Sequence, residues 1–350
     1  MTSLRISVED PSRVDLGSLL ATEEGVTIGH EPRVLDALAA AYRLRGEIVV
    51  ARRDGVPVGA LPLVRIRGPL GAIDASVAYL DGGGPIGPPD VRDALVAFAA
   101  ARSASRGAVL ELRASNEPTA PDGFATVVSR DKDTLVRALP KDPDEIAKGL
   151  DPKTRNQLRK ALREGLSSDT VAATPGTIAA FRAVYARTLR DLGSPPHALE
   201  FFERLVAALS GRAHVARVIA STGELLAAAL VLDDRRGGSV LPWAASDRRA
   251  DALEPNTLLY HELLTAAVER GRARFDFGRS TRESAQFKFK TRWGAEPTAL
   301  HWTTISRGAR RAPVAREKEG KLRHVVAAWR QLPVRLSSSL GPVLLRWLPA

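Results

Sequence analysis

The sequence contains no cysteine among its 350 residues. Disulfide frameworks, thiolate metal sites and cysteine nucleophiles are therefore excluded. Histidine is also scarce, with six residues scattered along the chain and no HExxH or comparable spacing. A metal site built from histidine is not expected, because such ligands normally recur at short and regular intervals.

Long apolar runs are missing as well. No stretch has the roughly 20 apolar residues that a helix needs to cross a bilayer. The start, MTSLRISVEDPSRV, has no basic segment followed by an apolar one, so a secretory signal is not indicated. We therefore expect a cytoplasmic protein, or one bound peripherally to the inner face of the membrane.

The remaining composition is typical of a globular protein. Apolar residues make up 44% of the chain and charged residues 26%, and the length suits two domains of ordinary size. The net charge is +11, from 51 Lys and Arg against 40 Asp and Glu. Two explanations of this excess stay open: arginine-rich codon usage, or an anionic partner such as phosphate, nucleic acid or a lipid headgroup.

An internal repeat organises the chain. Two apolar runs around the turn Asp54-Gly55 form a hairpin pattern, and the same pattern returns around Ser221-Thr222-Gly223. In each half a helical pattern follows and ends at a glycine, Gly107 or Gly271. Matching features lie about 165 residues apart, which favours a duplicated domain over two unrelated α/β domains that share an order of elements.

The second half has the clearer periodicity. It predicts two helices, three antiparallel strands, a helix and a strand, followed by a short helix and a last strand. The predicted helices span 177–190, 199–209, 256–270 and 283–290, and the predicted strands span 213–220, 224–232, 239–245, 274–277 and 298–305. This order is that of the GNAT acetyltransferase fold, and the first half is a partial copy of it.

We accordingly expect an α/β (α+β) protein with two tandem GNAT-like domains, each a mixed, largely antiparallel sheet flanked by helices. The predicted bounds are 1–145 for the N-terminal domain, 146–306 for the C-terminal domain and 307–350 for an amphipathic tail.

Specific motifs carry a resemblance to a known family. The run FDFGRS (275–280), followed by FKFKTRWG (287–294), resembles the signature of the Fem family of peptidoglycan-type acyl and aminoacyl transferases. In particular, the chain resembles FemAB-related proteins found beside exopolysaccharide and protein-sorting gene clusters. The resemblance covers most of the chain, since it extends through 153–166, 192–205, 242–246, 255–271 and 329–349.

Three polar residues lie where a predicted strand ends. Asp276 alternates with Phe275 and Phe277, so its carboxylate and the two rings point to opposite faces. Arg279 and Ser280 follow directly after a glycine that permits a sharp turn. An acid, an arginine and a hydroxyl at a strand end favour an anionic or polar ligand. A salt bridge from Asp276 to a neighbouring helix is the structural alternative.

The Fem resemblance places the family lysine at Lys290 and the aromatic-glycine pair at Trp293-Gly294. In that family the lysine is implied to lie near the reacting acyl and phosphate groups, where a fixed cation stabilises a developing oxyanion. An exposed amphipathic turn is the alternative for Lys290, and core packing is expected of Trp293. The chain departs from the family pattern at Ala285 and Phe287, and a phenylalanine has no hydroxyl for a proton relay.

A basic helix precedes these elements. Arg155, Arg159 and Arg163 recur every four residues and form one stripe, although like charges at this spacing destabilise a helix. Two leucines are expected to dock the helix, Leu158 and Leu162. The resemblance implies a phosphate-bearing substrate or a tRNA end near Arg155, Asn156 and Arg159, and a solvated helix face is the alternative.

The same resemblance implies that an acyl donor enters between two splayed strands, 239–245 and 274–277. Trp243, Asn256 and Tyr260 would line this gap, although each suits the core equally well. Before the 256–270 helix we find no Q/R-x-x-G-x-G/A loop, whose amides hold the pyrophosphate of acetyl-CoA in other users of this fold. A tRNA-borne or otherwise carried acyl group is therefore favoured over acetyl-CoA as the donor.

The tail has an amphipathic pattern. Leu322, Val325, Val326 and Trp329 share one helical face, and the segment VRLSSSLGPVLLRWLP (334–349) mixes aliphatic residues with Arg and Trp. Two interpretations stay open: the tail lies in a membrane interface near a lipid-linked acceptor, or it packs on the body of the protein.

Together these observations predict a transferase that moves an acyl or aminoacyl group to an amine or hydroxyl of a cell-envelope or exopolysaccharide precursor. Catalysis would rest on positioning and oxyanion stabilisation, with no covalent enzyme intermediate, no metal and no firmly implied cofactor. Expected partners are an acyl donor (aminoacyl-tRNA or acyl-CoA) and a phosphate-bearing or saccharide acceptor. The alternatives are an acetyl-CoA-dependent N-acetyltransferase and a non-catalytic basic protein that binds nucleic acid or an anionic polymer.

Overall fold

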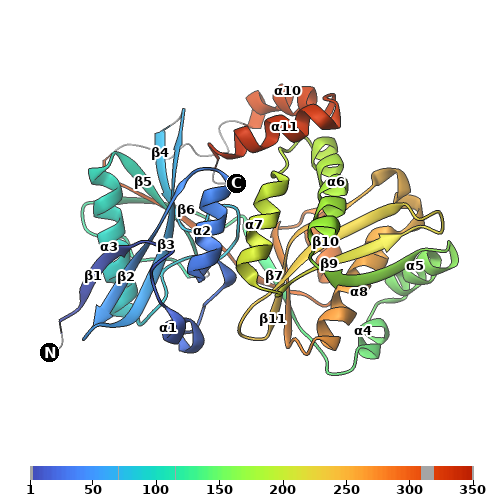
Figure 1. Ribbon diagram of the computed structural model, residues 1–350, viewed down its shortest axis with the longest axis horizontal. Helices are drawn as coiled ribbons and strands as arrows, with labels where there is room; N and C mark the ends of the chain where they lie inside the picture. Colours follow the sequence, from blue (N-terminus) through green and yellow to red (C-terminus); the bar gives the residue numbers. More distant parts are fainter. Residues whose placement is uncertain (1–2, 70, 115, 309–318, 349–350) are drawn as a thin grey trace. The chain divides into compact units, whose positions relative to one another are not determined.

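The computed structural model describes residues 3–69, 71–114, 116–308 and 319–348, and it forms two compact units (Figure 1). Unit 1 is drawn from Met1–Lys132, Ala299–His324 and Val343–Ala350. Unit 2 is drawn from Asp133–Thr298 and Val325–Pro342. The chain therefore passes between the units more than once, and no single cut separates them.

Unit 1 is built on a seven-stranded sheet with the order β1-β2-β3-β4-β5-β14-β6. The strands are Arg5–Glu9 (β1), Arg45–Arg53 (β2), Val56–Gly68 (β3), Gly71–Ala75 (β4), Ala108–Ala114 (β5), Ala125–Ser129 (β6) and His301–Ser306 (β14). All neighbours are antiparallel except β4 and β5, which are parallel. The helices are Gly17–Thr22 (α1), Pro32–Ala41 (α2) and Pro89–Ser105 (α3), with a 3-10 helix at Ile28–His30 (η1).

Unit 2 has a second seven-stranded sheet, with the order β13-β7-β12-β11-β10-β9-β8. The strands are Lys132–Ala138 (β7), Ser167–Ala172 (β8), Ala213–Ile219 (β9), Leu225–Asp233 (β10), Gly238–Ser246 (β11), Arg274–Thr281 (β12) and Glu296–Ala299 (β13). The helices are Asp144–Lys148 (α4), Pro152–Arg163 (α5), Pro175–Leu192 (α6), Leu199–Leu209 (α7), Pro255–Glu269 (α8) and Ala285–Thr291 (α9), with a 3-10 helix at Arg248–Leu253 (η2).

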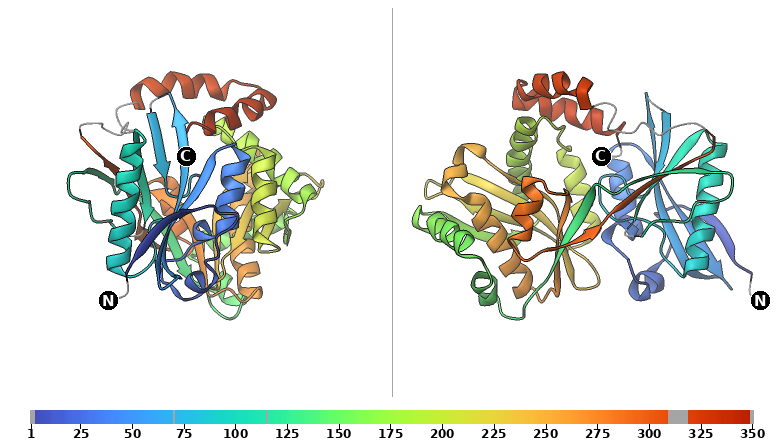
Figure 2. Two further views of the ribbon diagram at one scale, coloured as in Figure 1. Left: turned by 60° about the vertical axis from the view of Figure 1, so that its left-hand side comes forward. Right: turned by 180° about the vertical axis from the view of Figure 1, so that it is seen from behind.

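The helices of unit 2 cover both faces of its sheet. Helices α6 and α7 lie on one face and α8 on the other, with α5 packed against α8 (Figures 1 and 2). The α8 face holds the main apolar core, which includes Phe275, Phe277 and Trp293. Burial of this amphipathic surface is what stabilises the unit, since apolar area removed from water contributes about 25 cal/mol per Å². The expected core packing of Trp293 agrees with its full burial.

The two sheets share one design, as the internal repeat predicts. Four strands run antiparallel, a helix then crosses over, and a parallel strand follows; the crossover helix is α3 in unit 1 and α8 in unit 2. Tandem GNAT-like units of mixed, largely antiparallel sheet flanked by helices are therefore confirmed. Parallel neighbouring strands need a helix-sized crossover connection, which explains why the repeat is long.

One strand in each sheet, β14 in unit 1 and β7 in unit 2, departs from the predicted order. Strand β14 follows β13 in sequence but pairs with β5 of unit 1, and β7 follows β6 but lies beside β12 of unit 2. The single strand expected at 298–305 is therefore two strands that belong to different sheets. A division at residue 145 does not describe these units. Periodicity in a sequence identifies a strand but not its partner, because pairing in a sheet is non-local.

Two helices form the C-terminal part, Glu319–Arg330 (α10) and Val334–Leu345 (α11). They lie across the ends of α6 and α7 (Figure 2), where Trp329 Nε1 donates to the Ser194 carbonyl at 3.1 Å. Arg190 Nη1 likewise donates to the Leu332 carbonyl at 2.9 Å. The predicted tail begins at residue 307, and its residues 309–318 lie outside the described residues. Among the described residues, no helix combines the length and the apolar character that crossing a membrane requires.

Candidate active site

The strands β11 and β12 separate midway along their length. Their parallel ladder contains three residue pairs and ends at Val240 and Asp276, although the strands continue to Ser246 and Thr281. Strand β11 has an extra residue at this level, because its register against β10 shifts between Leu230 and Leu232. Bulges of this kind bend a strand and end its pairing, and they are common beside active sites.

Gly278 produces the matching distortion in β12. Its φ of +71° lies in the left-handed region, and a Cβ at this position would come within 2.7 Å of the Leu241 carbonyl oxygen. Only glycine fits such a close approach between two backbones. The two strands predicted to splay apart therefore do so at one defined level of the sheet.

Two of the predicted site residues hold this turn. The Asp276 carboxylate accepts hydrogen bonds from the Gly278 amide at 2.8 Å and from the Thr134 hydroxyl of β7. The Lys290 ammonium donates to the carbonyl oxygens of Gly278 at 2.9 Å and Arg279 at 3.1 Å. Lys290 is only 2% exposed, so the alternative of an exposed amphipathic turn does not apply to it. Its charge lies beneath the turn and fixes two carbonyl groups there.

Arg279 is half-buried, and its positive charge acts on Tyr185 of α6 and on His197 just before α7. Burial, together with the positive charges of Arg182 and Arg279, lowers the pKa of His197 to about 3. The imidazole of His197 is therefore neutral at physiological pH, and it stacks on Phe201 at 4.1 Å between ring centroids. His197 is not among the residues predicted for the site, although it lies in a segment that resembles the family.

Ser280 is the next residue of β12 and is 3% exposed. Its Oγ is buried and has no hydrogen-bond partner among the described residues. Buried hydroxyl groups nearly always have a partner, because leaving one unsatisfied costs about 1–3 kcal/mol. An unsatisfied hydroxyl beside the separated strands is the arrangement expected of a group that binds a ligand.

Trp243 and Tyr260 lie in two separate aromatic clusters. Trp243 packs edge-on against Phe201 and Phe202 of α7. Tyr260 stacks on Phe277 at 5.9 Å in the core on the α8 side of the sheet. Burial raises the pKa of Tyr260, so its hydroxyl stays protonated. The structure therefore does not bring these two residues together at one wall of the site.

The start of α8 carries a carboxylate where a phosphate-binding loop would require donors. Glu254 precedes the helix, and its carboxylate accepts from Gln157 Nε2 at 3.1 Å and from Thr257 Oγ1 at 3.3 Å. Pro255 occupies the first position of the helix and has no amide hydrogen. Asn256 Nδ2 donates to the Ser246 hydroxyl at 2.8 Å and so joins the helix to the end of β11. A helix start with a carboxylate over it is a poor site for pyrophosphate.

Helix α5 exposes two arginines of the predicted stripe, Arg159 and Arg163. Asn156 and Arg159 are exposed, and Arg159 Nη1 donates to Asn156 Oδ1 at 3.4 Å. Arg155 is half-buried, and its Nε–H has no acceptor among the described residues. Leu158 docks the helix as predicted, but the prediction for Leu162 is wrong, since Leu162 is 55% exposed. The helix is docked through one leucine and Ala161, and its arginine stripe stays available to an anion.

In unit 2 the strands β11 and β12 separate beyond their parallel ladder, whereas in unit 1 a loop fills the corresponding position beside β5. Its parallel pair β4–β5 ends at Ala75 and Glu111, and the following loop then continues alongside β5. Within that loop the Gly83 amide donates to the Arg113 carbonyl at 2.9 Å, and the Ser76 hydroxyl accepts from the Arg113 amide at 2.8 Å. The loop's own backbone thus occupies the space beside β5, so we place the chemistry in unit 2.

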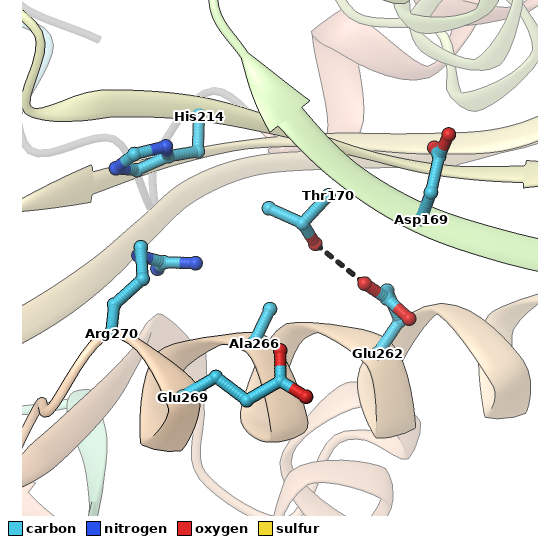
Figure 3. A pocket seen from close by; sticks show the side chains of 7 residues that line it. All are labelled: Asp169, Thr170, His214, Glu262, Ala266, Glu269 and Arg270. Atoms are coloured by element: carbon cyan, nitrogen blue, oxygen red, sulfur yellow. Dashed lines mark hydrogen bonds between the residues drawn. The ribbon is translucent and has the colours of Figure 1, made fainter.

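A separate cleft lies between β8, β9 and α8 (Figure 3). Its volume is about 270 Å³, and Asp169, Thr170, His214, Glu262, Ala266, Glu269 and Arg270 line it. Thr170 donates to Glu262 at 2.8 Å, and Arg270 pairs with Asp233 at 3.0 Å, so much of its charge is internally compensated. None of the predicted site residues lines this cleft. Within the part of the chain that the structure describes, no group of three His, Cys, Asp or Glu residues could hold a metal ion.

With this geometry in place, comparisons with known proteins define the class. Residues 152–291 match the family model described as Acetyltransferase (GNAT) domain. That match spans α5 to α9 and includes every predicted site residue, although Thr134 of β7 lies outside it. Residues 152–291 of unit 2 therefore form a GNAT-type domain, and the sheet of unit 1 repeats its design.

Solved structures support the same fold. FemX is similar with a TM-score of 0.60 and 14% identity, over 81% of this chain and 94% of that one. L-PGS from Bacillus licheniformis has a TM-score of 0.54 and 12% identity, over 90% and 97% of the two chains. A tandem GNAT protein from the clavulanic acid biosynthesis pathway has a TM-score of 0.54 and 15% identity, over 89% and 100%. No curated protein matches the sequence.

The expected resemblance to Fem-type acyltransferases is thereby confirmed at the level of the fold, with a Fem protein among the similar structures.

Proposed function

We propose that the chain transfers an acyl or aminoacyl group from a carrier other than free acetyl-CoA to an amine or hydroxyl of a cell-envelope precursor. The observation that carries this proposal is the start of α8, where Glu254 and Pro255 replace the amides that would hold a pyrophosphate. Because the family model nevertheless matches this domain, the acyl group must be presented by other means. A tRNA-borne aminoacyl group fits, since its phosphates can be bound outside the helix start.

The basic stripe of α5 supports this choice of donor. Arg155 offers a buried, unsatisfied N–H, and Arg159 is exposed beside it with Asn156. Arginine binds phosphate through paired N–H groups, so we propose that these three residues bind the phosphate of the tRNA end or of the acceptor. The separated strand ends of β11 and β12 would then be held in place by interior contacts of Trp243, Asn256 and Tyr260.

The proposed reaction needs no covalent enzyme intermediate. The acceptor nitrogen or oxygen attacks the acyl carbonyl and forms a tetrahedral intermediate, which collapses with release of the carrier hydroxyl, and the acceptor's proton passes to that leaving group. The Ser280 hydroxyl would donate to the oxyanion, and Arg279 would contribute positive charge from the other face of β12. Lys290 and Asp276 would act beneath the turn by positioning it, rather than by touching the substrate as the family pattern implies.

The acceptor class follows from resemblance and from similar structures. The Fem signature is that of peptidoglycan-type transferases, and FemX and L-PGS share the fold. We infer a peptidoglycan or exopolysaccharide precursor that carries phosphate or saccharide, used on the cytoplasmic side of the membrane.

Native mass spectrometry of the purified chain tests the donor. The proposal expects retained tRNA, or binding of added aminoacyl-tRNA that falls about tenfold or more in an Arg155→Gln/Arg159→Gln variant. Arg204→Gln is the matched control, because it removes an exposed helical arginine of unit 2 that pairs with Glu200. Binding of tRNA that the double variant leaves unchanged would contradict the proposal.

A CoA-dependent N-acetyltransferase is the second candidate, favoured by the description of the matching family. Calorimetry with acetyl-CoA separates the two. Saturable micromolar binding that Glu254→Gln strengthens would support the acetyl-CoA function, because the carboxylate opposes the pyrophosphate. A third possibility, a non-catalytic basic binding protein, would show salt-dependent binding of tRNA without transfer to any acceptor.

A further inference from the structure

Helix α11 turns its small residues inward and its large apolar residues outward. Ser337 is fully buried, and Gly341 packs so closely on Pro196 that a Cβ there would come within 2.6 Å of the Pro196 carbonyl oxygen. Leu336 is 52% exposed and Leu340 is 48% exposed. The sequence left open whether this segment packs on the protein or meets a membrane, and its packing through small residues leaves the apolar face free.

The outward residues form one continuous surface, here called the α11 stripe: Leu336, Leu340, Val343 and Leu344. Their spacing of four, seven and eight residues places them on a single helical face. Trp347 and Leu348, which follow the helix, are exposed as well. Soluble proteins rarely leave such a contiguous apolar surface uncovered unless it binds something.

The charges around the stripe indicate what it binds. Arg330, Arg335 and Arg346 are exposed, and residues 324–348 contain no Asp or Glu. On a helical wheel Arg335 and Arg346 fall next to the stripe, on the side away from the buried Ser337. A protein partner of ordinary composition would need a separate carboxylate opposite each of these arginines. A surface of anionic phosphates matches all of them at once.

We propose that the α11 stripe docks the protein on an anionic phospholipid surface, with the helix lying in the plane of the interface. At 12 residues the helix is about 18 Å long, too short to cross the hydrocarbon core but sufficient to lie along it. Leucine and valine enter the acyl boundary, Arg335 and Arg346 meet the lipid phosphates, and Trp347 takes the headgroup level that suits an amphipathic ring. This docking is separate from acyl transfer, and either proposal can fail without the other.

Cosedimentation of the full chain with vesicles tests the docking. Vesicles of phosphatidylcholine alone are compared with vesicles of equal parts phosphatidylcholine and phosphatidylglycerol. The full chain should bind the anionic vesicles more tightly, and added salt should weaken that binding. The Leu336→Glu/Leu340→Glu variant should lose binding by about a hundredfold or more, since charges replace two leucines that the proposal inserts into the lipid.

Two further variants separate the apolar and electrostatic contributions. Arg335→Gln/Arg346→Gln should reduce binding to anionic vesicles by about fivefold per arginine and leave binding to phosphatidylcholine unchanged. Val127→Glu is the matched control, because Val127 is an exposed apolar residue of β6, and it should bind as the original chain does. All variants change exposed residues, so circular dichroism and melting temperature should stay the same.

Three results would overturn the proposal. The first is that the full chain fails to cosediment with anionic vesicles. The second is that the Leu336→Glu/Leu340→Glu variant cosediments as well as the original. The third is a dimer in sedimentation velocity without lipid that the same variant converts to monomer, which would assign the α11 stripe to a second copy of the chain.

Discussion

At the residue scale, Asp276 and Lys290 hold the same turn from two sides. Asp276 accepts from the Gly278 amide, and Lys290 donates to the Gly278 and Arg279 carbonyls. The sequence identified both residues through the family signature, but it could not predict that Lys290 is buried. Lysine is among the residues least often buried, so its burial is visible only in three dimensions.

Replacing Lys290 with methionine tests its positioning role. Lys290→Met keeps the length of the side chain and removes both hydrogen bonds, so the rate constant kcat should fall about ten- to hundredfold with little change in KM. Lys288→Met is the matched control, since Lys288 is exposed on the same helix. Both are measured well below the melting temperature, where lost stability alone does not lower kcat. An unchanged kcat in Lys290→Met would remove Lys290 from the mechanism.

His197 makes stability depend on pH. Its pKa is about 3 in the folded protein and about 6.5 when unfolded, so the unfolded chain takes up the proton first. The contribution is fully present above pH 6.5 and is lost as pH falls towards 3. Between pH 7 and pH 5 this loss is about 2 kcal/mol.

The His197→Phe variant keeps a ring in the aromatic cluster and removes the titrating group. Urea unfolding at pH 7 and pH 5 gives the free energy of unfolding lost between the two pH values. That loss should be about 2 kcal/mol smaller in the variant than in the original chain. His30 and His261, whose pKa values burial also lowers, remain in both proteins and cancel in the comparison. The same pH dependence in both proteins would contradict the assignment.

At the element scale, the separation of β11 and β12 depends on Gly278. The hairpins, the helices α5 to α9 and the strand ending near Phe277 were predictable, because their turn residues and periodicities are local in sequence. Strand β8 was missed because its sequence, SSDTVA, has little apolar character. The bulge in β11 was missed because one extra residue in a strand does not change its composition, and Pro242 is the sole residue there that hints at it.

A pair of glycine variants isolates the close approach at this turn. Gly278 and Gly237 both have a positive φ, but only a Cβ at Gly278 would meet another atom, the Leu241 carbonyl oxygen. Gly237→Ala should lower the free energy of unfolding by about 1 kcal/mol. Gly278→Ala should lower it by about 2–4 kcal/mol and reduce transfer, because the strands must shift apart. Equal effects of the two substitutions on stability and transfer would show that the close contact is unimportant.

At the scale of the whole molecule, the exchanged strands β7 and β14 tie the two halves of the sequence together. Duplication was predictable from the repeat of hairpin, helix and strand. The exchange was not, because both strands lie where a sequential reading continues the preceding domain, and only pairing with β12 or β5 reveals their place.

Truncation tests the exchange. A fragment of residues 1–145 retains β7 without β12 and leaves β5 and β6 without β14, so it should aggregate instead of unfolding cooperatively. Joining residues 1–132 to 299–308 restores β14, and the Lys132 carbonyl already accepts from the Leu300 amide at 3.1 Å, so a short linker suffices. Cooperative thermal unfolding of the joined fragment alone is expected. Cooperative folding of residues 1–145 by themselves would refute the need for β14.

Single-turnover transfer by the full chain decides which donor the protein uses. Labelled aminoacyl-tRNA and labelled acetyl-CoA are each mixed with the protein and with nucleotide-linked or lipid-linked envelope precursors, and the label on the acceptor is followed in time. Label should move from tRNA to a precursor, and Ser280→Ala should slow this step about ten- to a hundredfold. Label that stays on tRNA while the acetyl group of acetyl-CoA reaches an acceptor would contradict the proposed donor.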